Sequence, residues 1–209
     1  MGIFDLEKQL AFYGAYHSNP VNILIHMVFV WPIFFTGLIL FNFTPPLFNL
    51  PPIQLCEHSS LVLNYGFLFA LVYGVFYVCL DKKAGSLAAL LCLICWVSSS
   101  MIARQLGFSL AWKYVIVGAD YDTHGQVVLA AQLLCWTGQF IGHGVFEKRA
   151  PALLDNLIQA FLMAPFFVLL EALQTLFGYE PYPGFHSKVK ATIDAEIKEW
   201  QEKKQKKIS

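Results

Sequence analysis

The chain has 209 residues, of which 57% are hydrophobic and 13% are charged, and its formal net charge is zero. Soluble domains carry about 25% charged residues, so this composition indicates a membrane-embedded protein. A chain without a basic surplus gives no indication of nucleic-acid binding, and the length predicts one membrane-embedded domain without a second globular one.

Four segments lack Asp, Glu, Lys and Arg and approach the roughly 20 residues that a transmembrane helix needs. They are residues 21–43, 61–80, 84–103 and 125–146. A fifth apolar region, 156–177, contains Pro165 and Glu171. It predicts either a kinked span or a pair of re-entrant half-helices that never crosses. The sequence therefore predicts an all-α polytopic membrane bundle with four to six apolar segments.

The charged tail predicts a solvated helix from about Lys188 to Lys207. We therefore expect a membrane domain over residues 1–180 and a cytosolic tail over residues 181–209. The final Lys-Lys-Ile-Ser matches the dilysine retrieval signal of endoplasmic-reticulum membrane proteins, which is read by a receptor. Because that signal works only on a cytosolic tail, it favours the re-entrant interpretation of the fifth apolar region.

Loop charges predict the orientation of the spans. The connection 44–60 contains no Lys or Arg, whereas the turns at 81–83 and 147–149 each carry a positive pair. The positive-inside rule then assigns these two turns and the N-terminus to the cytosol. Ionisable groups at the start of the first span and at the end of the fourth should therefore lie at one depth, facing the cytosol.

Three histidines at this depth, His17, His26 and His143, are candidate metal ligands. A titratable side chain in a membrane helix is costly and by default suggests a functional site. Gln139 and Glu147 lie four residues before and after His143, so a helix puts all three on one face. Imidazole suits iron, copper or zinc, and three imidazoles with a carboxylate suit ferrous iron. The sequence therefore predicts a buried metal site.

A helix break after His17 should bring that residue to the site. Asn19 can cap the next helix and Pro20 can begin it, so His17 can fold back toward His26. A continuous helix would put these two histidines on opposite faces. Asn22 shares a face with His26 and is a candidate for supporting the site and binding substrate.

Each candidate also has a simpler interpretation. A membrane histidine often serves as a hydrogen-bonded contact between helices, and Glu147 could be only the first charge after a span. The other histidines, His58, His124 and His186, fall in loops or in the tail and are left out of the site.

Three blocks of the chain resemble a known family. They are residues 9–17, 19–26 and, most specifically, 139–157. They are similar to the fungal and bacterial family of 2-hydroxy fatty acid dioxygenases, long called a domain of unknown function, whose yeast member acts in phytosphingosine degradation. The resemblance extends to about residue 180 and is weaker in the connections.

The resemblance implies a multi-pass endoplasmic-reticulum membrane enzyme of sphingolipid breakdown. It implies that Fe(II) and molecular oxygen are used to shorten a long-chain 2-hydroxy fatty acid by one carbon. It also implies that His17, His26 and His143 hold the iron. The resemblance leaves the fourth ligand open, for which Glu147, Gln139 or another histidine could serve. Glu147 and Gln139 are accordingly the candidate catalytic residues.

Substrate binding gives two further expectations. Lys148 or Arg149 should pair with a carboxylate that enters from the cytosolic leaflet of the lipid bilayer. The acyl chain should lie between the apolar spans, among residues such as Phe140, Phe166 and Phe167.

Two other functions stay open at this point. A non-catalytic membrane lipid-binding protein would use the histidines as contacts between helices. A zinc-dependent lipid hydrolase would use Glu147 as a general base and would turn over without oxygen.

Overall fold

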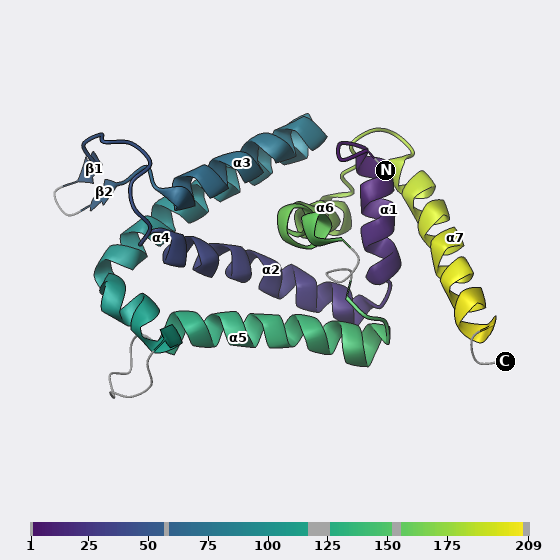
Figure 1. The fold of residues 1–209 in the computed structure, drawn as a ribbon. Helices are drawn as coiled ribbons and strands as arrows, with labels where there is room; N and C mark the ends of the chain where they lie inside the picture. The colour runs from purple at the N-terminus through teal and green to yellow at the C-terminus, as the bar shows by residue number, and fades with distance from the viewer. Residues whose placement is uncertain (1, 57–58, 117–125, 152–155, 207–209) are drawn as a thin grey trace.

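The computed structural model describes residues 2–56, 59–116, 126–151 and 156–206, which form a helical bundle with one small hairpin (Figure 1). The helices are α1 (Leu6–Tyr16), α2 (Pro20–Phe41), α3 (Tyr65–Leu80), α4 (Lys82–Ile116), α5 (Gln126–Ile141), α6 (Ala164–Phe177) and α7 (Phe185–Lys206). Two π-helical segments, η1 (Gly142–Glu147) and η3 (Gln159–Met163), follow α5 and precede α6; strands β1 (Ile53–Cys56) and β2 (Ser59–Leu61) pair in antiparallel fashion. The predicted all-α fold class is confirmed.

Several predicted boundaries differ from those in the structure. The segment expected at 84–103 is longer in the structure, because α4 continues without interruption to Ile116. The segment expected at 61–80 becomes helical only at Tyr65, because the residues before it complete the hairpin and Asn64 caps the helix. The Asn64 side chain accepts a hydrogen bond from the backbone N–H of Phe67 at 3.2 Å. His58 and His124, like Lys207, lie outside the described residues.

Helices α2 to α5 run back and forth along one long direction, so their ends gather at two opposite ends of the molecule. Figure 1 shows the start of α2, the turn between α3 and α4, and the end of η1 toward one end, with the hairpin at the other. The turn is tight because the Asp81 carboxylate accepts a hydrogen bond from the backbone N–H of Ala84 at 2.6 Å. The start of the first span and the end of the fourth therefore lie at the same end of the bundle, as the loop charges predict.

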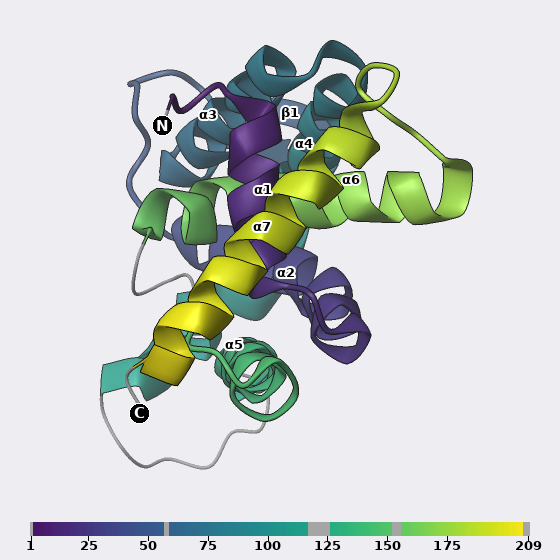
Figure 2. The ribbon, with the colours of Figure 1, turned by 90° about the vertical axis from the view of Figure 1, so that its right-hand side faces the viewer.

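Helices α1, α6 and α7 cover the end at which α2 begins. Helix α6 is seen end-on in Figure 1 and lengthwise in Figure 2, whereas α5 is seen lengthwise in Figure 1 and end-on in Figure 2. The axes of the two helices therefore cross. Pro165 lies in the first turn of α6, where its missing N–H is tolerated, and η3 precedes it. If α2 and α5 cross a bilayer along their length, α6 lies roughly across them and does not span it. This orientation favours the re-entrant interpretation of 156–177.

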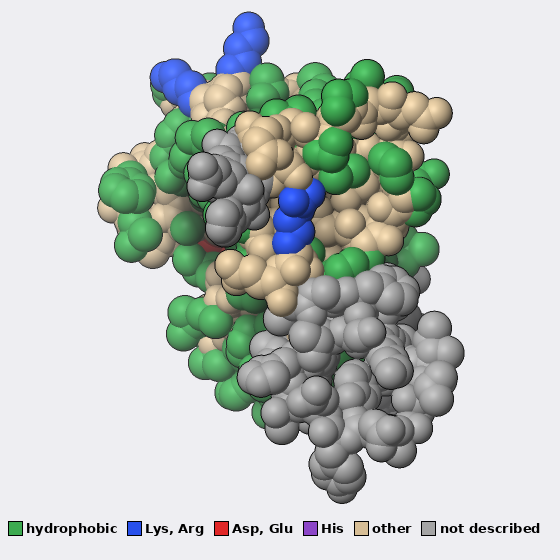
Figure 3. Space-filling model, turned by 90° about the vertical axis from the view of Figure 1, so that its left-hand side faces the viewer, with side chains coloured by type: hydrophobic (Ala, Val, Ile, Leu, Met, Phe, Trp, Pro, Cys, Tyr) green, Lys and Arg blue, Asp and Glu red, His purple; other side chains and the backbone are tan. Residues whose placement is uncertain are grey.

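Apolar helix surfaces face outward over much of the bundle. Large exposed apolar side chains include Leu24, Val28, Leu71, Val75, Leu90 and Leu133. Three described stretches are long and apolar enough to cross a membrane: Pro20–Phe41, Lys82–Gln105 and Gln159–Phe177. Helix α3 is 16 residues long, shorter than expected. Helix α5 continues directly into η1, so that helical structure covers 126–147, close to the expected 125–146. Figure 3 shows the hairpin end, where few Lys or Arg side chains interrupt the described apolar and neutral surface. These surfaces indicate association with a membrane.

Gly85 is needed for the close packing of α3 on α4. A Cβ atom at this position would lie 2.0 Å from the carbonyl oxygen and 2.4 Å from the carbonyl carbon of Tyr77. Backbone atoms cannot move aside as a flexible side chain can, so the two helices would have to separate.

We predict that Gly85→Ala lowers the melting temperature of the detergent-solubilised protein. The forced separation should cost about 1–3 kcal/mol, more than the ~1 kcal/mol that alanine gains in helix propensity. Gly144→Ala is the matched control, because a Cβ atom there would meet nothing within 4 Å. Equal melting temperatures for the two variants would contradict the packing argument.

Candidate metal centre

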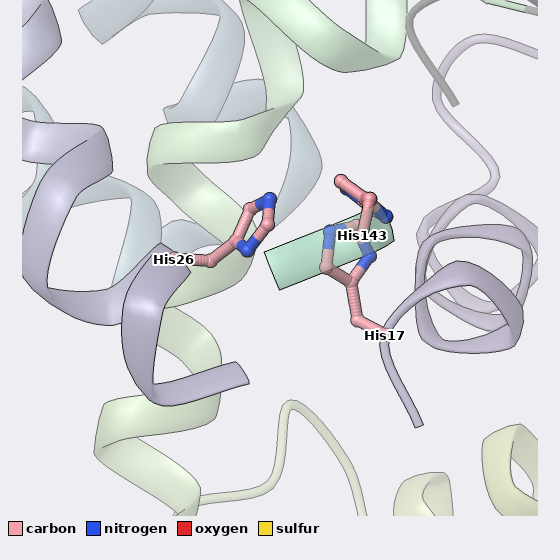
Figure 4. A group of neighbouring side chains, drawn as sticks. All are labelled: His17, His26 and His143. Carbon is pink, nitrogen blue, oxygen red and sulfur yellow. The ribbon is translucent and has the colours of Figure 1, made fainter. Parts of the chain in front are cut away.

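His17, His26 and His143 meet in one buried cluster although they come from three separate segments. One ring nitrogen from each lies within 4.8 Å of those of the other two, and the three residues are 7%, 5% and 4% exposed. Their ring centroids are 4.3, 4.8 and 4.9 Å apart. Figure 4 shows the rings gathered around a common space. The structure thus brings together the three histidines that the sequence singles out.

Backbone carbonyls orient two of the three rings. His17 Nδ1 lies 2.8 Å from the carbonyl oxygen of Tyr13, and His26 Nδ1 lies 2.9 Å from that of Asn22. A protonated Nδ1 donates to each carbonyl and leaves the Nε2 lone pair free, as is usual for metal-binding histidines. Among the described residues, neither His17 Nε2 nor His143 Nδ1 has a hydrogen-bond partner. The nitrogens facing the common space are therefore available as ligands.

Burial favours the neutral form of His17. Desolvation lowers the pKa of this imidazole well below its usual value, and the neighbouring His26 and His143 lower it further. A metal ion binds the neutral imidazole, so the environment of His17 suits a ligand better than a charged partner.

The break between α1 and α2 puts His17 beside His26. His17 ends α1, and its backbone N–H donates to the carbonyl of Gly14 at 3.1 Å. The Asn19 side chain then caps α2 by accepting from the N–H of Val21 at 2.9 Å, with Pro20 in the first turn. The helix break expected from these residues is therefore present.

The π-helical segment η1 carries His143 toward α2. Such segments are rare, occur mostly as single turns within α-helices, and are frequent at functional sites. Gly142 permits the close approach, because a Cβ atom there would lie 2.3 Å from Asn22 Oδ1. The side chain of Asn22 is fully buried at this contact. Helical spacing alone does not indicate this change of helix type.

Glu147, the last residue of η1, holds the turn that precedes α2. Its carboxylate accepts hydrogen bonds from the backbone N–H groups of Ser18 and Asn19 at 3.1 and 3.0 Å. It also accepts from Ser18 Oγ at 2.5 Å and from Asn22 Nδ2 at 3.1 Å. We call this set of contacts the Glu147 clamp. It joins the segment that carries His143 to the turn that carries His17.

An apolar cavity of about 840 Å³ extends from the histidines along α2 and α5, and residues of α3, η3 and the start of α6 complete its wall. Its wall includes all three histidines, and Gln139 lies beside them with an amide Nε2 that has no partner among the described residues. Phe140 also lines the cavity, as expected. Phe166 and Phe167 do not line it: both are fully buried in the core, with Phe166 stacked on Tyr77. The structure therefore gives no support to the expectation that these two residues contact an acyl chain.

Lys148 and Arg149 do not line the cavity either. Lys148 is exposed in a left-handed backbone conformation with φ of 53°. The Arg149 guanidinium donates to the carbonyl of Ala15 at 2.7 Å and lies 3.6 Å from the ring centroid of Tyr16. The geometry therefore gives no support to the prediction that these cations receive a substrate carboxylate, and Arg149 instead joins the end of α1 to η1.

Tyr13 is a site residue that the sequence analysis missed. Its ring stacks on His17 with centroids 3.9 Å apart, and its hydroxyl is buried without a partner among the described residues. It lines the apolar cavity and also a smaller cavity of about 350 Å³ that reaches Glu171 and Lys190. Its position four residues before His17, on the same helical face, was the available signal.

Comparisons with known proteins identify the family of the chain. The family model described as "Mpo1-like: 2-hydroxy-palmitic acid dioxygenase Mpo1-like" matches residues 3–176. A Saccharomyces cerevisiae relative, named 2-hydroxy-palmitic acid dioxygenase MPO1, is 33% identical over 200 residues, covering 95% of this chain and 94% of the relative. No solved structure matched the chain. Because the family model covers most of the chain, including all three histidines, the chain belongs to the Mpo1-like family.

Proposed function

We propose that this protein is an Fe(II)-dependent dioxygenase that shortens long-chain 2-hydroxy fatty acids by one carbon. The observation that carries the proposal is the buried three-histidine cluster at one end of an apolar cavity of about 840 Å³. The cavity suits an acyl chain, and the name of the yeast relative supports the substrate class.

The donor set fits a divalent metal. His17, His26 and His143 would hold it through nitrogens that face a common space, two of them in rings oriented by backbone carbonyls. Bound Fe(II) would supply positions at which oxygen and the 2-hydroxy acid can be held and activated.

The overall reaction needs no reductant other than its substrate. A 2-hydroxy acid and one O2 give the acid one carbon shorter, one CO2 and one water. The 2-hydroxy carbon becomes a carboxyl carbon and the former carboxyl carbon leaves as CO2, which together release four electrons. One O2 accepts four electrons, so the balance closes without 2-oxoglutarate.

The protein's own groups would bind and orient the substrate. The apolar wall between α2 and α5 would hold the acyl chain and exclude water from the histidines. The unpartnered Gln139 amide would donate a hydrogen bond to the polar head of the substrate. Asn22 and Glu147 would act as positioning residues, because their side chains hold the turn beside His17 and do not line the cavity.

The same proposal includes a location. Loop charges, the gathering of the histidine-bearing segments at one end, and the dilysine sequence support an endoplasmic-reticulum membrane protein whose site faces the cytosol. Residues 1–180 would form the membrane domain. Residues 181–209 would form an aqueous tail whose helix α7 packs on α1 through Ile193, against Gly14.

We predict that each of His17→Ala, His26→Ala and His143→Ala lowers bound iron from about one per chain toward zero. Oxygen uptake with a long-chain 2-hydroxy acid should fall more than about 100-fold in each. Metal analysis of anaerobically purified protein, followed by oxygen-electrode measurements, provides the test. His186→Ala is the control, because His186 lies outside the cluster and its Nε2 contacts the carbonyl of Tyr179. If the three substitutions leave the iron content unchanged, the histidines are contacts between helices and not metal ligands.

We predict that turnover requires oxygen in a one-to-one ratio with the 2-hydroxy acid consumed. Product analysis by mass spectrometry in the presence and absence of oxygen measures this ratio. Product formation under strict anaerobiosis would support a zinc-dependent hydrolase instead. Glu147 is poorly suited to be its general base, because its carboxylate already accepts hydrogen bonds from two backbone N–H groups.

We predict that Glu147→Gln destabilises the protein by about 1–3 kcal/mol, because an amide offers one acceptor oxygen where the clamp uses two. The melting temperature and the affinity for iron should fall together, since the clamp positions His17. Lys148→Gln, at an exposed neighbouring position, is the control. Unchanged stability and iron affinity, with catalysis alone reduced, would instead make Glu147 a catalytic residue.

A further inference from the structure

One face of α2 lines the apolar cavity from end to end. The lining residues of this helix are His26, Val30, Ile33, Phe34, Gly37, Leu40 and Phe41. Their spacing of three and four residues is that of a single helical face. The cavity therefore runs lengthwise along α2, starting at a histidine of the cluster.

Residues of α5 line the cavity as well, and this helix runs antiparallel to α2. Its lining residues, from Leu129 through Gln132 and Trp136 to Gln139, lead to His143. Gln132 Nε2 donates to the carbonyl of Ile33 at 3.0 Å, so the middle of α5 lies beside the middle of α2. Both walls thus place a histidine at the same end and apolar side chains toward the other.

The length of this wall can be compared with an acyl chain. Gly37 lies eleven residues after His26 and Phe41 lies fifteen after it, which correspond to about 16 and 22 Å at the rise of an α-helix. An extended chain of single bonds advances about 1.2 Å per bond. Gly37 is therefore level with about the fourteenth bond from the histidines, and Phe41 with about the eighteenth.

Gly37 leaves space in the cavity at this level. A Cβ atom built there would meet nothing within 4 Å, whereas at Gly138 on α5 it would come within 2.6 Å of the Phe29 ring. The missing side chain of Gly37 therefore leaves space in the cavity, whereas that of Gly138 allows close packing against Phe29. Beyond it on α2, Phe41 lines the far part of the cavity, and the Phe69 ring packs against both Phe34 and Phe41, with ring centroids 6.3 and 5.0 Å away.

We infer that Gly37 sets the acyl-chain length that the cavity accepts, by leaving open the space for carbons beyond about the fourteenth. Phe41 forms the far limit on α2. This inference rests on the proposed function for the identity of the ligand, a long-chain 2-hydroxy acid whose polar head lies at the histidines. The position is a specificity determinant distant from the reacting atoms.

The test is a chain-length profile of the iron-loaded protein in Gly37→Phe and Ile33→Phe. Saturated 2-hydroxy acids of about 8 to 20 carbons serve as substrates, with kcat/KM from oxygen uptake. Gly37→Phe should lower kcat/KM at least about tenfold for chains longer than about 14 carbons and leave shorter ones within about twofold. Ile33→Phe, about 6 Å nearer the histidines, should move the cut-off to about 9 carbons.

The exposed residue Val28 provides the control, because it does not line the cavity and Val28→Phe adds similar bulk to the same helix. Its profile should match that of the wild type. Phe41→Ala should extend the profile toward longer chains, a gain that a folding defect cannot produce. Binding of unreactive fatty acids without the 2-hydroxyl group, measured by calorimetry, should show the same cut-offs.

The outcomes separate this inference from the proposed function. Wild-type turnover with identical chain-length profiles in Gly37→Phe, Ile33→Phe and Phe41→Ala would overturn the role of Gly37 and leave the dioxygenase intact. Shifted cut-offs in fatty-acid binding, without oxygen uptake by the wild type, would support the role of Gly37 and reject the dioxygenase.

Discussion

The Glu147 clamp is the contact on which the rest of the site depends. One carboxylate accepts hydrogen bonds from the backbone of Ser18 and Asn19 at the start of α2 and from the side chain of Asn22. The N-terminal end of a helix attracts negative charge, and charge-assisted hydrogen bonds are stronger than neutral ones. The clamp therefore fixes two segments, distant in sequence, that each carry a histidine.

Helix α2 combines the two physical environments that the proposed chemistry needs. Near its start, His26 and the capped turn create a small polar centre whose groups are oriented by backbone carbonyls. Along the rest of one face, apolar side chains and Gly37 border a long cavity. The outward faces carry residues such as Leu24, suited to lipid. A single helix thus borders the histidine cluster, the apolar cavity and the outer apolar surface.

The sequence predicted those parts of the site that follow from local rules. Histidines in apolar segments are costly to bury, so His17, His26 and His143 were recognisable without a structure. Asn19 was recognisable as a helix cap because capping involves only neighbouring residues. Helical spacing also put Glu147 on the face of His143, but could not identify what it contacts.

The remaining features depend on contacts between distant segments. Arg149 binds the carbonyl of Ala15 and packs on Tyr16, and nothing near Arg149 in the sequence indicates either contact. Phe166 and Phe167 are as apolar as the cavity residues, so only the packing of α6 decides that they belong to the core. The π-helical turn at Gly142 likewise depends on close contact with Asn22 of α2.

Because the three histidines come from three segments, metal binding and folding of the chain are coupled. No single segment can hold a metal ion with all three imidazoles, so tight binding would be restricted to the assembled chain. A ligand that binds only the folded state stabilises it by mass action, in proportion to the logarithm of its free concentration. The supply of the metal would then regulate how long each copy survives cellular quality control as well as how fast it works.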